Sequence, residues 1–258
     1  MALLEFAAQH RLILAAHAQA VLGLRQRSTA ARLNALCEAG LLEREPSRFR
    51  GRPACFLITS AGLKTIGSRL PKPRFDLAAH DHDVGLAWLY LAARVGKFGP
   101  ARAVLSEREM RSQDARADRV GPPHAVRLGG YDGHGRERLH YPDLVVELAS
   151  GHRIAFELEL TGKDTRRREK ILSGYGADRR IDAVVYLAED RAIQRNVQAS
   201  AARLGISSRV IVQRCAFPEP SRARGGGRTR ERARSAAAAE TRGATATRPT
   251  AARESLAR

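Results

Sequence analysis

Residues 139–160 constrain the fold more than any other part of the sequence, because they combine two apolar stretches with a short turn between them. The pattern predicts one strand over 139–148, a second over 152–160, and a tight turn at 149–151. Around this hairpin the periodicity predicts helix, strand, strand, strand, helix, strand, helix, strand over residues 76–215. The order predicts an α/β domain.

The remaining elements of that domain are predicted from apolar spacing and turn residues. Helices are expected at 81–96, 165–175 and 192–204, and strands at 103–106, 182–188 and 208–213. Residues 107–138 are polar and rich in Gly, Pro and Arg, so we expect loops there with at most one helical turn.

Three carboxylates lie at one end of the predicted hairpin. Asp143 follows a proline at the start of the first strand, and Glu157 and Glu159 lie two residues apart on the second, so they share a face. Three carboxylates at a sheet edge form a hard-oxygen site suited to Mg²⁺ or Mn²⁺, which activates water and neutralises a phosphate. The alternative is that both glutamates lie on the solvated face of an amphipathic strand.

The first 70 residues have a different pattern, with three helices predicted at 3–10, 13–22 and 28–39. Ser28 is expected to cap the third helix and Gly40 to end it in a left-handed conformation. The spacing places an apolar face on one side of this helix (Ala30, Leu33, Leu36, Cys37) and a small and basic face on the other (Ser28, Ala31, Arg32, Ala35). The second face is suited to a DNA groove.

A β-hairpin with an arginine-rich tip is predicted directly after that helix. Leu41 and Leu42 begin its first strand, and residues 55–59 form the second. A closing helix is predicted over 61–68, capped by Thr59 or Ser60. The tip carries four arginines (Arg44, Arg48, Arg50, Arg52). This is the layout of a winged helix, and it predicts DNA contacts by Ser28, Thr29, Arg32, Arg48, Arg50 and Arg52. The alternative is a small helical domain that contacts other proteins.

Charge and composition narrow the class of protein. The 258 residues carry 45 basic and 27 acidic side chains, a net charge of +18, which favours a polyanionic partner such as double-stranded DNA. Residues 218–258 have almost no large apolar side chains, so a disordered basic tail is predicted. Three separated cysteines indicate a reducing compartment. With no secretory signal or apolar span, we expect a cytoplasmic protein without membrane contact.

Together these stretches resemble a known family. STAARLNALCEAGLLERE, CFLITSAGLKTIG, the helix over 80–91, YPDLVVEL and FELELTGKDTRRREKILSGY resemble the replication-relaxation family of bacterial plasmid and mobile-element proteins. The resemblance covers residues 1–215 and implies a winged helix over 1–70 and a PD-(D/E)XK nuclease-like domain over 76–215. It implies a role in replication, DNA relaxation or mobilisation, and partners such as replication proteins or a second copy of the chain.

The nuclease pattern implies roles for particular residues. Asp143 and Glu157 would be metal ligands, joined by the carbonyl of Leu158, with Mg²⁺ or Mn²⁺ as the cofactor. Glu159 occupies the position that usually holds a catalytic lysine. Lys163 or Lys170 would then supply the missing cation. The catalytic residues predicted in this way are Lys170 and the three carboxylates. The alternative is a degenerate site in a domain that only binds or dimerises.

Three functions therefore remain open. The first is a DNA-binding protein of a plasmid or mobile element, the second a metal-dependent endonuclease or nickase, and the third a winged-helix transcriptional regulator. The histidines show no metal-ligand spacing: His80 and His82 are expected at a helix start or surface, and His140 in or near a loop.

Overall fold

The structure is a computed structural model, and it describes residues 1–45, 52–116, 123–215 and 217. Met1–Arg222 form one compact unit, which includes both ranges predicted as folded domains. The two domain boundaries stay a prediction. The predicted basic tail over 218–258 lies outside the described residues. Within the described ranges, no helix is both long and apolar enough to span a membrane.

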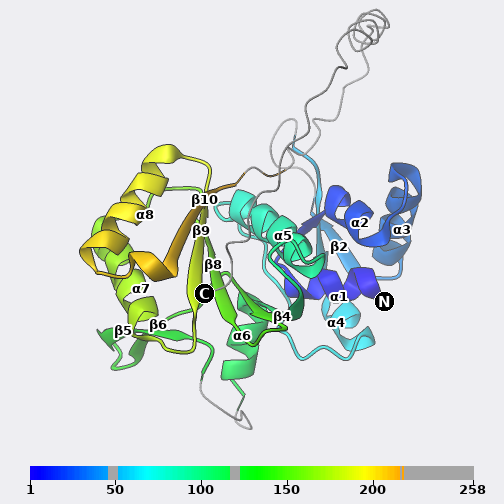
Figure 1. Ribbon diagram of the computed structural model, residues 1–258. Helices are drawn as coiled ribbons and strands as arrows, with labels where there is room; N and C mark the ends of the chain where they lie inside the picture. Colours follow the sequence, from blue (N-terminus) through cyan, green and yellow to red (C-terminus); the bar gives the residue numbers. More distant parts are fainter. Residues whose placement is uncertain (46–51, 117–122, 216, 218–258) are drawn as a thin grey trace, which may run out of the picture. The chain divides into compact units, whose positions relative to one another are not determined.

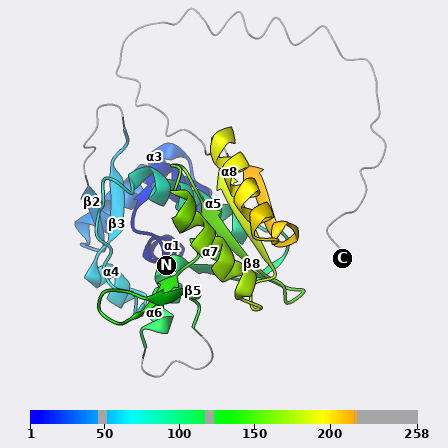
Figure 2. The same ribbon diagram turned by 90° about the vertical axis from the view of Figure 1, so that its left-hand side faces the viewer.

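The N-terminal part combines four helices with a small antiparallel sheet (Figures 1 and 2). Its elements are α1 (Ala2–Gln9), β1 (Ile13–Leu14), α2 (Ala15–Leu22), α3 (Gln26–Glu38), β2 (Leu42–Glu45), β3 (Cys55–Ile58) and α4 (Ser60–Thr65). The strand order is β1-β3-β2. The predicted hairpin is confirmed, since Leu42 pairs with Ile58, and so is Thr59 as the cap of α4.

The predicted helix over 13–22 is wrong in its first two residues. Ile13 and Leu14 form a strand against Phe56 and Cys55, because both side chains are buried in the core there. The helix then starts at Ala15, and the Nδ1 atom of His17 accepts a hydrogen bond of 3.0 Å from the Leu14 N–H. His17 thereby satisfies a donor that the helix leaves unpaired.

Helix α3 starts two residues earlier than predicted, at Gln26, with Arg25 as its cap. Ser28 is therefore inside the first turn and does not cap the helix. The end is as expected: Gly40 has a φ of 69°, and the Leu41 N–H bonds to the Leu36 carbonyl at 2.9 Å. This left-handed residue turns the chain directly into β2.

A mixed five-stranded sheet forms the centre of the second part, in the order β10-β9-β8-β7-β4. Its strands are β4 (Ala101–Ser106), β7 (Leu144–Leu148), β8 (Arg153–Leu158), β9 (Ala183–Ala188) and β10 (Val210–Arg214). The β4–β7 and β7–β8 pairs are antiparallel, and β8–β9 and β9–β10 are parallel. The predicted hairpin over 139–160 is thus confirmed as β7–β8, with Gly151 in its turn at a φ of 90°.

Helices cover both faces of this sheet (Figure 1), which explains why its central strands β7, β8 and β9 carry buried apolar runs. Helix α5 (His80–Arg94) packs on one face, where Leu89 and Tyr90 share a core with Phe156 and Leu158. Helices α7 (Thr165–Ala177) and α8 (Arg191–Arg203) cover the other face, where Leu172 packs against Tyr186. An expected helix or strand is found at each of these positions.

Residues 107–138 differ from the predicted loops. They contain α6 (Glu107–Asp114) and the strands β5 (Val126–Tyr131) and β6 (Glu137–His140), which pair antiparallel. Helix α6 forms because the Ser106 hydroxyl accepts from the Glu109 N–H and Met110 is fully buried. The strand predicted over 139–148 is divided because Pro142 has no N–H to donate to a neighbouring strand.

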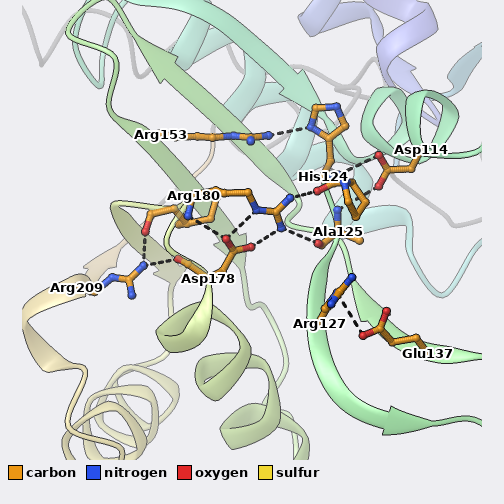
Figure 3. A network of polar contacts seen from close by, with 11 residues as sticks. Asp114, His124, Ala125, Arg127, Glu137, Arg153, Asp178, Arg180 and Arg209 are labelled. Atoms are coloured by element: carbon orange, nitrogen blue, oxygen red, sulfur yellow. Dashed lines mark hydrogen bonds and ion pairs between the residues drawn. The ribbon is translucent and has the colours of Figure 1, made fainter. Parts of the chain in front are cut away.

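An arginine–carboxylate network fixes the start of β5 against the end of α7 (Figure 3). The Arg180 guanidinium pairs with Asp178 at 2.6 Å and donates to the carbonyls of Pro123 and Ala125. Asp114 accepts the N–H of Ala125 at 3.1 Å. The β5–β6 hairpin is thereby anchored to α6 and α7.

Close packing against a glycine continues this contact. A Cβ atom on Gly174 of α7 would lie 2.7 Å from the Arg127 carbonyl oxygen of β5, so only glycine permits the hairpin to approach this closely. His140, which pairs with Val126 at this same end of the hairpin, reaches the C-terminal end of β8.

Candidate functional site

The C-terminal end of β8 opens into a cleft of about 780 Å³. We call it the carboxylate cleft, and many of its lining residues are charged. Six of them, from α5, β6, the segment before β7, the end of β8 and the segment before α7, contact one another at its centre: Asp143, Glu157, Glu159, Lys163, His82 and His140. The three carboxylates that the sequence predicted therefore do lie in one site.

Asp143 owes its place to the register of β7 and β8. Leu144 pairs with Phe156, so Asp143 lies beside the residues that end β8. Its Oδ2 atom accepts a hydrogen bond of 2.8 Å from the Leu158 N–H and lies 3.2 Å from Nε2 of His82 on α5. Burial lowers the pKa of His82, but Asp143 outweighs it, and the pKa is raised overall.

Glu157 is held by three side chains and is only 1% exposed. Its Oε1 atom accepts from the Tyr175 hydroxyl at 2.5 Å and lies 2.6 Å from Nε2 of His140, and its Oε2 atom lies 3.6 Å from Nζ of Lys163. Burial raises the pKa of Glu157, but His140 and Lys163 outweigh it and lower the pKa to about 2. Glu157 is therefore ionised at neutral pH although it is buried.

Glu159 is equally buried, at 1% exposure. Its Oε1 atom accepts from the Lys163 N–H at 3.2 Å, whereas Oε2 has no hydrogen-bond donor and lies 3.7 Å from Nζ of Lys163. The alternative that both glutamates lie on a solvated strand face is therefore wrong. Burying them is costly without positive charge nearby, which indicates that the site has a function.

Lys163 supplies that positive charge. Burial lowers its pKa, but Glu157 and Glu159 raise it overall, so the ammonium stays protonated between the two carboxylates. Of the two lysines proposed from the nuclease pattern, only Lys163 reaches the cleft. Lys170 is exposed on α7 and does not line the cleft, so the structure does not place it among the site residues.

The donors in the cleft agree in chemistry, though not in arrangement, with a divalent cation. Asp143, Glu157 and Glu159 offer the hard oxygens that Mg²⁺ and Mn²⁺ prefer, and Oε2 of Glu159 has no hydrogen-bond partner. Within the described residues, however, no three or more His, Cys, Asp or Glu side chains are grouped closely enough to hold a metal. In this arrangement, Lys163 supplies positive charge beside two of the carboxylates.

The structure places the residues predicted to contact DNA in different environments. Ser28 and Arg32 are exposed on α3, together with Arg27. Thr29 is 1% exposed and its hydroxyl bonds to the Arg25 carbonyl, so it lies outside this surface. Arg48 and Arg50 lie outside the described residues.

Arg52 has a different environment from the one predicted for a wing tip. It forms an ion pair with Asp81 at the start of α5, and its Nη1 atom lies 3.0 Å from Nδ1 of His80. This contact ties the return strand of the hairpin to α5.

Three residues that contact the carboxylates are not predicted from the sequence. His140 and His82, which line the cleft, contact Glu157 and Asp143, and Tyr175, which is buried outside the cleft lining, donates to Glu157. One signal was available: His140 lies three residues before Asp143, in HYPD. The histidine on α5 and the tyrosine on α7 come from distant segments, so their spacing gave no signal.

Asp83 provides a test of electrostatics next to the cleft. It is 4% exposed on α5, with Oδ1 3.9 Å from Arg11 and Oδ2 without a hydrogen-bond donor. Burial raises its pKa to about 6, above the value of 3.8 for the unfolded chain. Ionised Asp83 therefore costs stability above pH 6, and this cost disappears as the pH falls towards 4.

We therefore expect Asp83→Asn to unfold at higher urea concentration than the wild type at pH 8. The gain is up to about 3 kcal/mol at pH 8 and close to zero at pH 4, because neutral Asp83 and Asn are alike. Urea titrations at pH 4, 6 and 8 measure it, with the exposed Glu5→Gln as control. A gain independent of pH would show that the pKa of Asp83 is not raised in the folded protein.

Comparisons with known proteins found no match: no family model, no curated protein and no solved structure is similar to this chain.

Proposed function

We propose that the protein binds duplex DNA through the exposed face of α3. One observation carries the proposal: this face presents Arg27, Ser28, Ala31, Arg32 and Ala35 to solvent, while Thr29 and Leu33 are buried. Small and basic side chains on one helix face permit a close approach to a groove and its phosphates.

The order of the N-terminal elements supports the proposal. A winged helix has the order helix, strand, helix, helix, strand, strand, and its third helix enters the major groove. The same order runs from α1 to β3, with strand order β1-β3-β2, and α3 is the third helix. The net charge of +18 favours the same partner.

Replacing the two arginines of this face tests the proposal. We expect Arg27→Ala/Arg32→Ala to weaken binding to duplex DNA and to lower the slope of log Kd against log salt by about two, one for each lost phosphate contact. Fluorescence anisotropy from 50 to 300 mM salt, roughly the range over which such contacts are lost, measures both. The matched control is Arg191→Ala/Arg195→Ala, two exposed arginines of α8. Equal affinities for the two variants would place the binding face elsewhere.

A second candidate function is metal-dependent hydrolysis of a phosphodiester bond in the carboxylate cleft. The observation that favours it is Lys163, whose ammonium lies within 4 Å of Glu157 and Glu159 although it comes from outside the ExE motif. The element order β4, β7, β8, α7, β9 also agrees with a PD-(D/E)XK nuclease-like fold.

Each group then has a role in this chemistry. Asp143, Glu157 and Glu159 would have to move closer together to hold Mg²⁺ or Mn²⁺, and the bound ion would then activate water and neutralise the phosphate. Lys163 would stabilise the negative charge that develops on the phosphate. His140 and Tyr175 would keep Glu157 ionised and in place.

The biological role proposed with these functions is replication, DNA relaxation or mobilisation of a plasmid or mobile element, and it rests on the family resemblance alone. A transcriptional regulator remains the alternative, with the second part as a dimerisation or partner module. It predicts binding to a two-fold symmetric site and no cleavage with any metal.

A further inference from the structure

A second concave surface lies next to the carboxylate cleft and is lined by arginines. It has a volume of about 500 Å³, and α6 supplies Arg108, Arg111 and Ser112, with Arg116 just beyond the end of the helix. Arg11, between α1 and β1, and Arg69, after α4, complete the lining. We call this surface the arginine groove.

The arginine groove has more positive charge than its surroundings neutralise. None of the described residues that line it is acidic. Two acidic groups beside it pair with its guanidinium groups: Glu107 with Arg11 at 3.3 Å and Arg111 at 2.8 Å, and Asp83 with Arg11 at 3.9 Å. Arg69 and Arg116 are exposed, and no described residue forms an ion pair with either.

One of the arginines is built into the floor of the groove. Arg108 donates to the Ala8 carbonyl at 3.2 Å and to the Pro71 carbonyl at 2.7 Å, so its guanidinium is fixed. Burial, together with the nearby Arg11, lowers its pKa to about 10. Holding like charges together in this way costs free energy, and an anionic ligand would recover it.

The groove is continuous with the cleft, because Arg11 and Arg111 line both. Arg111 also lies over the ring of Tyr141, 4.2 Å from its centre, two residues before Asp143. Positive charge therefore extends from the exposed arginines of α6 to the three carboxylates.

We propose that the arginine groove binds the phosphodiester backbone of DNA that flanks the carboxylate cleft. Guanidinium groups recognise phosphate through paired hydrogen bonds, and a row of them from three separate segments matches a ligand with repeated negative charges. A small anion would need only part of the row. The inference rests on the proposed function, since it concerns the same DNA.

The test replaces Arg69 and Arg116, because Arg108 supports the fold and Arg11 and Arg111 form ion pairs with Glu107. We expect Arg69→Ala/Arg116→Ala to lower the salt slope of duplex DNA binding by about two. Arg191→Ala/Arg195→Ala, which removes the same charge from α8, should leave the slope unchanged. The readout is fluorescence anisotropy of a labelled duplex on the full chain, with polyglutamate as a competing polyanion.

The outcomes separate this inference from the proposed function. If the wild type does not bind duplex DNA, both fail. If Arg27→Ala/Arg32→Ala weakens binding but Arg69→Ala/Arg116→Ala behaves like the α8 control, only the groove proposal is overturned. If the groove variant binds DNA normally but loses competition by polyglutamate, the groove takes an acidic protein segment instead, and the proposal is again overturned.

Discussion

Supercoiled plasmid incubated with the wild-type protein and Mg²⁺ or Mn²⁺ is expected to be nicked, and Asp143→Asn is expected to lower the nicking rate by about 10²–10³-fold, the loss typical when one electrostatic group of a preorganised site is removed. Asparagine has the same shape, and its amide oxygen can still accept the Leu158 N–H that Asp143 accepts at 2.8 Å. What it loses is the negative charge that a divalent cation requires.

Three controls give this result its meaning. Glu5→Gln removes an exposed carboxylate of α1 and should nick at the wild-type rate. A chelator should stop nicking by both proteins, and DNA binding by Asp143→Asn should equal that of the wild type. Undiminished nicking by Asp143→Asn would contradict the assignment of the site. Binding without nicking in the wild type, with either metal, would favour the regulator.

The second large effect concerns stability. Lys163→Met is expected to lower the free energy of unfolding by about 3 kcal/mol, the loss typical when one partner of a buried ion pair is removed. Lys163 is 25% exposed and lies between two carboxylates that are almost fully buried. Without its ammonium, burial raises the pKa of Glu157 with less opposition, so the loss should be larger at pH 8 than at pH 5.

Urea unfolding of matched variants measures this loss. Lys170→Met removes an exposed lysine of α7 and should change stability by less than about 0.5 kcal/mol, as surface substitutions usually do. Adding Glu159→Gln to Lys163→Met should restore part of the loss, because one buried charge is then removed with its partner. If Lys163→Met is as stable as Lys170→Met, the ammonium does not neutralise the carboxylates in solution.

Much of the fold could be predicted from local sequence patterns. The β7–β8 hairpin and the end of α3 at Gly40 were predicted correctly because alternation, apolar runs and turn residues act over a few positions. The strand at Ile13 and Leu14 was missed because its partners, Phe56 and Cys55, lie some forty residues away. No local pattern distinguishes two buried residues before a helix from its first turn.

The residues of the candidate site could likewise be predicted only in part. Asp143, Glu157 and Glu159 were found because period-two spacing and antiparallel pairing can be deduced from the sequence. His82, His140 and Tyr175 were missed because three different elements bring them to the cleft. The network that docks the β5–β6 hairpin on α7 depends on Arg180, Asp178 and Gly174, none of which has a pattern of its own.

The docked β5–β6 hairpin influences the pKa of Glu157 but supplies none of the three carboxylates. His140 ends β6, outside the five-stranded sheet, and its charge helps to keep Glu157 ionised. Any change that moves the hairpin, such as a side chain at Gly174, alters the proton affinity of Glu157 without moving the backbone of β7 and β8, which positions the three carboxylates. Mutations in the β5–β6 hairpin, made by design or acquired in evolution, could therefore change the proton affinity of Glu157. They would replace no residue that would contact a metal or a phosphate.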